Sequence, residues 1–140
     1  MLSKVTRDEY LEKHFLISPG VPGAAGGTTL TNVATADLAV AEIPVPRNMT
    51  LRSVAVAYTS ETGTGPALTA KVKRGGAAGT TLASATASDA ATCSIGTPVS
   101  AFVSRCEVLT VTIGSANADN DFVNPTIVVT LCPIFSDENG

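Results

Sequence analysis

From residue 28 onward, the chain is a succession of short segments rich in Val, Ile, Leu and Thr, separated by turn-forming residues. Residues 68–74 show the pattern most clearly, because apolar Leu68, Ala70 and Val72 alternate with polar neighbours, as in a strand with one buried face. Gly, Pro, Asn and Asp lie between the segments, where turns need positive φ or tolerate a missing donor. Seven strands are predicted, at residues 35–43, 50–60, 68–74, 80–87, 93–103, 107–113 and 125–134.

Strands at such short intervals, with no helical period between them, are typical of a sandwich or barrel. The chain has 140 residues, which suits a single core. Only 15% of the residues are charged, and the recurrent aliphatic runs argue against disorder, which is the competing interpretation of this composition. The predicted fold class is all-β: an antiparallel, jelly-roll-like β-sandwich of about seven to eight strands, preceded by a short helical arm.

The first 15 residues differ in composition from the rest, because charged residues are concentrated there. Thr6 and Glu9 have the spacing of a capping box, and Glu9 with Lys13 forms an i,i+4 pair. These features predict a short helix at residues 7–15. Residues 18–27 then hold two prolines and four glycines, which is typical of a linker. The predicted division is an N-terminal arm at residues 1–27 and a sandwich domain at residues 28–140.

The arm supplies the candidate binding residues, and among them Tyr10, Leu11 and Phe15 belong to the apolar face of the predicted helix. The candidate binding residues are Leu2, Val5, Arg7, Tyr10, Leu11 and Phe15. A helix this short is not stable alone, so we expect it to be stabilised by docking on its own domain or on a neighbour.

Charge and composition exclude several function classes. The formal net charge is −3, so the field of the protein repels polyanions, and nucleic acid is not an expected partner. No apolar run approaches the roughly 20 residues of a membrane span, so no membrane partner is expected. The three cysteines, Cys93, Cys106 and Cys132, have no paired spacing and favour buried, reduced thiols in a protein made in the cytosol.

Residues capable of chemistry are few. His14 is the single histidine and lies on the arm, without a nucleophile that has a recognisable signature around it. The segment 117–121 places Asn and Asp oxygens at alternate positions, as calcium loops do, but it lacks the distal Glu, and turns favour the same residues. Lys71, Lys73 and Arg74 suggest the solvated outer face of a strand. We therefore expect no enzyme, no catalytic residue, no metal and no cofactor.

Three parts of the sandwich resemble β-sandwich modules of tailed-phage virion proteins. Residues 44–54 are similar to their opening, in which an apolar residue, Pro and a polar turn lead into a strand. Residues 65–76 are similar to their alternating strand that ends in basic residues and Gly. Residues 109–114 and 126–131 are similar to their closing strand pair. One segment departs from the pattern, because residues 104–107 replace a Gly-Asp turn.

Such modules occur in capsid decoration (cement) proteins and in head or tail fibres. The short chain with its arm is most similar to a decoration protein. This resemblance implies a virion structural protein on the outside of a phage head, made in the host cytoplasm, with the major capsid protein and itself, as a homotrimer, as partners. Deletion of residues 1–27 is then expected to leave a folded sandwich that no longer binds capsids. The alternative is a fibre-tip or adhesin-like module that binds a host-surface glycan, although the chain has no Trp.

Overall fold

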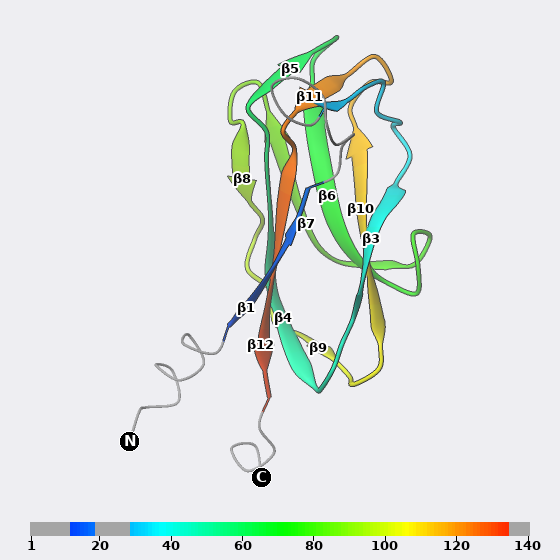
Figure 1. Cartoon of the computed structure of the whole chain (residues 1–140), viewed down its shortest axis with the longest axis vertical. Helices are drawn as coiled ribbons and strands as arrows, with labels where there is room; N and C mark the ends of the chain where they lie inside the picture. The colour runs from blue at the N-terminus through cyan, green and yellow to red at the C-terminus, as the bar shows by residue number, and fades with distance from the viewer. Residues whose placement is uncertain (1–11, 19–28, 135–140) are drawn as a thin grey trace.

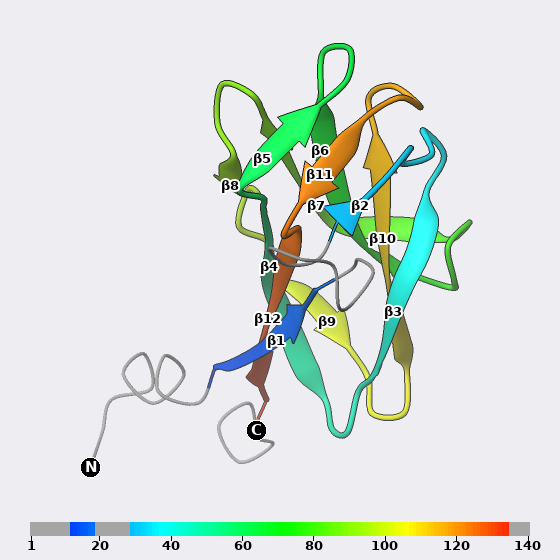
Figure 2. The same ribbon diagram turned by 45° about the horizontal axis from the view of Figure 1, so that its top comes forward.

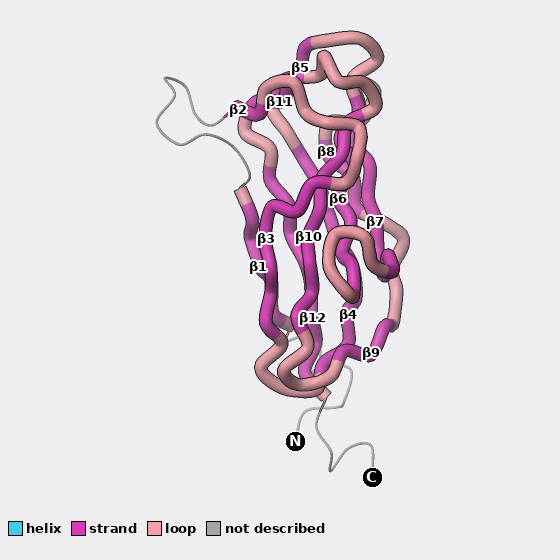
Figure 3. Tube along the Cα trace, turned by 90° about the vertical axis from the view of Figure 1, so that its right-hand side faces the viewer, coloured by secondary structure: helices cyan, strands magenta, loops and turns pink. Residues whose placement is uncertain are grey.

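The computed structural model describes residues 12–18 and 29–134. These residues form strands, turns and loops only (Figure 3), so no helix among them could cross a membrane. The strands are β1 (Lys13–Ile17), β2 (Thr29–Leu30), β3 (Leu38–Pro44), β4 (Met49–Ala57), β5 (Ser60–Thr62), β6 (Ala67–Arg74), β7 (Thr80–Ser88), β8 (Cys93–Ile95), β9 (Ala101–Val103), β10 (Val108–Ser115), β11 (Asp121–Val123) and β12 (Thr126–Pro133).

The strands form three antiparallel sheets. Sheet I has the order β1-β12-β4-β8, and β9 also pairs with β4; sheet II has the order β3-β10-β6-β7. Figure 1 shows β12 and β4 on one side of the molecule and β10 and β3 on the other. Sheet III, in the order β2-β11-β5, lies across one end of the sandwich, and Figure 2 shows its three strands side by side. The fold is therefore an all-β antiparallel sandwich.

The apolar alternation of the sequence decides which face of each long strand is buried. On β6, Leu68, Ala70 and Val72 are fully buried, as the pattern predicts. On β4, the buried Leu51 and Val54 lie three residues apart, which breaks the period of two. A β-bulge explains this spacing, because Leu51 and Ser53 pair with consecutive residues of β12.

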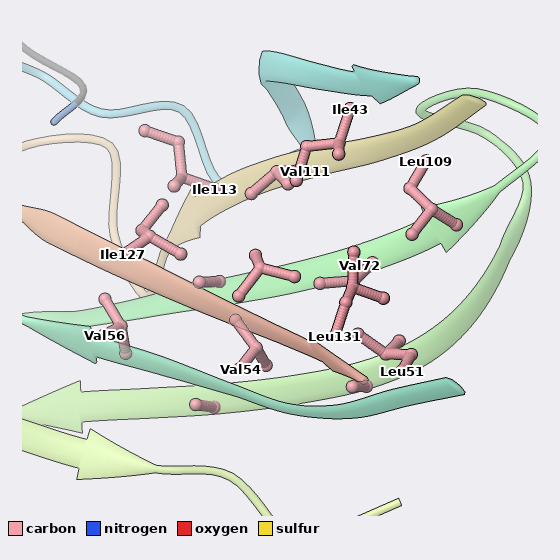
Figure 4. Packing of buried hydrophobic residues seen from close by; sticks show 14 of the residues in the cluster. Ile43, Leu51, Val54, Val56, Val72, Leu109, Val111, Ile113, Ile127 and Leu131 are labelled. Atoms are coloured by element: carbon pink, nitrogen blue, oxygen red, sulfur yellow. The ribbon is translucent and has the colours of Figure 1, made fainter. Parts of the chain in front are cut away.

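The core lies between sheets I and II and is made of aliphatic side chains. Figure 4 shows Val54, Val56 and Leu131 of sheet I facing Val72 and Val111 of sheet II. All five are at most 1% exposed. Such burial removes apolar surface from water and supplies the main driving force of folding.

All seven predicted strands are present, but two of them are divided. Residues 50–60 form β4 and β5, because the chain leaves sheet I after Ala57 to reach sheet III, where the Thr59 amide donates to the Val123 carbonyl. Residues 93–103 form β8 and β9, which flank an irregular stretch containing Gly96 and Pro98. The short strands β1, β2 and β11 were not predicted from the sequence.

The predicted helix at residues 7–15 is wrong for its described part. Lys13, His14 and Phe15 belong to strand β1, which pairs with β12 from Lys13↔Leu131 to Ile17↔Ile127. The capping signal at Thr6 is local, whereas the free edge of β12 offers a whole ladder of backbone partners. Residues 7–11 lie outside the described residues, and the division of the chain at residue 27 stays a prediction.

The turn that departs from the phage pattern adopts the backbone shape that Gly would supply. Cys106 has φ of 69°, in the left-handed region, and the Glu107 amide donates to the Ser104 carbonyl over 3.1 Å. The turn can therefore form without Gly, because Cys106 itself adopts the left-handed conformation that Gly adopts most easily.

Candidate functional site

The structure gives partial information on the predicted arm residues. Leu2, Val5, Arg7, Tyr10 and Leu11 lie outside the described residues. Phe15 lies on β1, directly opposite Val129, and packs half-buried against the core. The Phe15 side chain therefore serves the fold, and a contact with a partner stays a prediction for the whole set.

Strand β1 instead brings a different side chain to the surface. Leu16 pairs with Val128 of β12, Val128 pairs with Ala55 of β4, and Ala55 pairs with Ile95 of β8. Directly paired residues of antiparallel strands share a face. Their neighbours Val54 and Val129 point into the core, so this row of four apolar residues lies on the outside of sheet I.

The two ends of this row are unusually exposed for large aliphatic side chains. Leu16 is 70% exposed and Ile95 is 73% exposed, whereas Val128 and Ala55 between them are partly covered. Single exposed apolar residues are common, but a continuous row across four strands is a feature of interaction surfaces.

Small and neutral side chains surround the row. We call the whole set the outer face of sheet I; its members are His14, Leu16, Ser53, Ala55, Ala57, Cys93, Ile95, Thr126, Val128 and Thr130. It contains no Asp, Glu or Lys. Arg52, exposed at the β-bulge of β4, lies next to Ser53, and the Glu12 carboxylate lies 3.8 Å from His14 Nε2. Beyond Arg52, sheet I continues to β9, where Phe102 pairs with Thr50.

His14 has a structural partner on this face. Its Nδ1 lies 3.1 Å from Thr130 Oγ1, across the β1–β12 pair. Among the described residues, no Ser, Cys or Asp contacts the His14 ring in the arrangement of a catalytic triad. The contact fixes β1 on β12 and gives the ring no evident chemical task.

The Asn/Asp segment 117–121 connects loops at the end of the sandwich that carries sheet III. Asp119 accepts hydrogen bonds from the Thr64 amide over 3.1 Å and from the Thr64 hydroxyl over 2.8 Å. These bonds, the hydroxyl first, lower the pKa of Asp119 below its usual value. Asp121 accepts from the Asn32 amide over 2.7 Å, and the buried Asn120 donates to the Thr64 carbonyl over 3.0 Å.

The oxygens that suggested a cation loop thus bind three loops to one another. Within residues 12–18 and 29–134, no group of three or more His, Cys, Asp or Glu side chains is arranged to hold a metal ion. The segment therefore makes hydrogen bonds that hold neighbouring loops together, as Asn and Asp often do in turns.

The basic residues of β6 are solvated only in part: Arg74 is exposed, as the sequence suggested, and pairs with Glu107, whereas Lys71 is half-buried and Lys73 is buried. Strand β6 lies inside sheet II, between β10 and β7. Lys73 is only 6% exposed and contacts the Asp37 carboxylate, and its Nζ donates to the Ala77 carbonyl over 2.8 Å. Lys71 Nζ donates to the same carboxylate over 3.1 Å. The two ammonium groups, Lys73 first, lower the pKa of Asp37.

This cluster predicts an acid-sensitive contribution to stability. Asp37→Asn is expected to lower the free energy of unfolding at pH 7 by about 1 kcal/mol, because charged hydrogen bonds are lost at a partly exposed site. Since the pKa of Asp37 is lower in the folded than in the unfolded chain, its contribution is present above the unfolded pKa, near 3.8, and is lost as pH falls through the folded value. Urea unfolding at pH 7 and at pH 3 measures both effects.

The matched control is Asp89→Asn, in the exposed turn between β7 and β8. It should change stability by less than about 0.5 kcal/mol, as surface substitutions do. If the Asp37 variant lost as little stability as the control at pH 7, the cluster would have no stabilising role.

Comparison with known proteins finds no match by sequence and only distant matches by structure. No family model matches the sequence, and no curated protein matches it. Among solved structures, a chain of the T13 particle of infectious bursal disease virus is 14% identical, with a TM-score of 0.40 over 86% of this chain and 31% of that chain. The VP2 subviral particle of the same virus gives 12% identity and a TM-score of 0.43, over 85% of this chain and 32% of that chain.

The module CsCBM6-3 from Clostridium stercorarium, solved in complex with cellobiose, is 15% identical, with a TM-score of 0.42 over 91% of this chain and 90% of that chain. The present chain spans about a third of the length of the two viral chains. The class that its own strands and packing define is an all-β antiparallel sandwich with an apolar outer face on sheet I.

Proposed function

We propose that this protein is a virion structural protein, a decoration (cement) protein that binds the outside of a phage head shell and stabilises it. The observation that carries the proposal is the outer face of sheet I, a surface without Asp, Glu or Lys crossed by an apolar row. Its partners are the major capsid protein and other copies of itself, as a homotrimer. The protein acts through surfaces, without a cofactor and without catalysis.

The sandwich and the arm have separate tasks in this proposal. The arm residues Leu2, Val5, Arg7, Tyr10 and Leu11 contact the shell, while β1 fixes the start of the sandwich through its ladder with β12. Many copies on one shell make weak single contacts effectively tight, because each bound neighbour raises the local concentration of the next.

The structure changes how the arm should be tested. Deletion of residues 1–27 would also remove β1, uncover the edge of β12 and remove Phe15 from the core. Deletion of residues 1–11 keeps β1. We expect this shorter variant to unfold at the temperature of the full chain and to lose at least about tenfold in affinity for the shell, as when a few anchoring side chains are removed.

The measurement is co-sedimentation with purified, undecorated head shells of the phage whose genome carries this sequence. A second variant without residues 1–18 should unfold at a lower temperature, which separates loss of the arm from loss of β1. Full shell binding by the variant that lacks residues 1–11 would rule out the arm as the attachment site.

A glycan-binding role is the second candidate, and one observation favours it. Phe102 on β9 is 54% exposed, and an exposed ring can stack on a sugar. Screening the full chain on a glycan array tests this role. Selective binding that Phe102→Ala abolishes, together with no binding to shells, would replace the decoration role.

A further inference from the structure

We infer that the outer face of sheet I is the surface through which copies of this chain pack against one another. The inference rests on the proposed structural role and names the partner of this face as a second copy of the chain. The contact centres on the row from Leu16 to Ile95, which crosses all of β1, β12, β4 and β8.

Charge favours a second copy over the other surfaces of the sandwich. Around a rotation axis, residues near the axis meet their own equivalents, so a charged surface meets like charge. The outer face of sheet II carries four charged residues, Lys71, Lys73, Asp37 and Glu42. The end with sheet III and its neighbouring loops carries acidic residues and, among the described residues there, no Lys or Arg; the acidic residues are Glu61, Asp89, Asp119 and Asp121.

Copies that met at the end with sheet III would place like charges together, and copies that met at the outer face of sheet II would have to remove its four charged residues from water. Both costs rise as water is excluded. The apolar row of sheet I avoids this cost, because the row itself is uncharged and Arg52, on the same strand as Ala55, lies three residues away from it. A chain with a net charge of −3 repels its own copies in general, so association needs such a neutral surface.

The heights of the side chains along the row suit packing against another sheet. The exposed Leu16 and Ile95 stand at the two ends of the row, and the partly covered Val128 and the small Ala55 lie between them. Protruding ends and a low centre allow side chains of two facing sheets to interdigitate, as in the inner faces of β-sandwiches. The face spans only four strands, so we expect an association that depends on concentration.

Sedimentation velocity over a range of protein concentrations tests this inference. The full chain should form dimers or trimers, and Leu16→Asp with Ile95→Asp should weaken association at least about tenfold, because two anchoring side chains are replaced by charge. Circular dichroism should show unchanged β structure, since both side chains point away from the core. The control is Leu38→Asp with Val108→Asp, which charges two exposed apolar residues of sheet II and should leave association unchanged.

The cysteines supply a second, independent readout. Cys93 is exposed on the outer face of sheet I, whereas Cys106 is exposed in the turn between β9 and β10. Alkylation followed by mass spectrometry should show that Cys93 reacts more slowly as the protein concentration rises, while the rate at Cys106 stays constant. The face variant should lose this protection.

The outcomes separate the inference from the proposed function. A full chain that stays monomeric at every concentration overturns the inference, and so does a face variant that associates as the full chain does. If that monomer still binds shells, the decoration role stands without this contact. If the full chain is a monomer that binds shells and the face variant does not bind them, the outer face of sheet I contacts the shell and not a second copy. If the full chain associates with itself but does not bind shells, the inference stands and the proposed decoration role is wrong.

Discussion

Phe122→Ala is expected to lower the free energy of unfolding by about 3–5 kcal/mol, the usual cost of removing a large buried ring. Phe122 is fully buried on β11, the middle strand of sheet III. Its ring lies 4.9 Å from that of Tyr58, centre to centre, in a tilted arrangement. Burial raises the pKa of Tyr58 to about 12, so this contact is made by an uncharged phenol at neutral pH.

This one change would remove a large part of the net stability of a small domain, which is roughly 5–15 kcal/mol. Urea unfolding of both proteins measures the difference. The matched control is Phe102→Ala, where the same atoms are removed from a ring that is 54% exposed, and the loss should be much smaller. Equal losses at the two positions would mean that Phe122 does not hold sheet III on the sandwich.

Gly96→Ala is expected to cost about 1–3 kcal/mol, because it forces extra volume into a closed contact. A methyl group at this position would lie 2.1 Å from the Ser84 carbonyl oxygen of β7 and 3.2 Å from the Val54 carbonyl oxygen of β4. The Gly96 amide also donates to the Val54 carbonyl over 2.9 Å. The backbone therefore cannot move away without breaking a hydrogen bond.

Gly96 lies where an edge strand of sheet II meets sheet I, so its substitution should separate the two sheets along that edge. Thermal unfolding of the variant measures the cost. Gly114→Ala is the control, because its nearest atom would be 3.4 Å away, an ordinary contact. A Gly96 variant as stable as the Gly114 variant would show that the two sheets are not closely packed here.

The sandwich could be predicted from the sequence because each long strand shows its buried face in its own pattern of apolar and polar residues. On β6, the alternation of Leu68, Ala70 and Val72 with polar residues defines the buried face without reference to any partner. Long strands with such a pattern fix their own register, since a shift by one residue would expose the apolar set. The short strands β2 and β11 lack the length for a pattern and were missed.

The surface proposed for binding could not be read from the sequence for a different reason. Leu16 and Ile95 are 79 residues apart in the sequence (95 − 16). They share a face only because β1 pairs with β12, β12 with β4, and β4 with β8. Nothing local in either segment specifies those partners. Asp37 is similar, because the carboxylate that pairs with Lys71 and Lys73 belongs to a distant segment. Tertiary pairing thus decides which polar residues are solvated.

The position of β12 has a consequence for how the chain acquires its structure. In sheet I, β12 lies between β1 and β4 and pairs with both. β1 and β12 lie near opposite ends of the described sequence. During synthesis, β1 and β4 therefore cannot pair with β12 until residues 126–133 have been made, although β4 can first pair with β8 and β9. Such non-local closure is typical of β-sandwiches that fold in times on the order of milliseconds to seconds. Until then, the inward side of β4 is an aggregation hazard for the nascent protein.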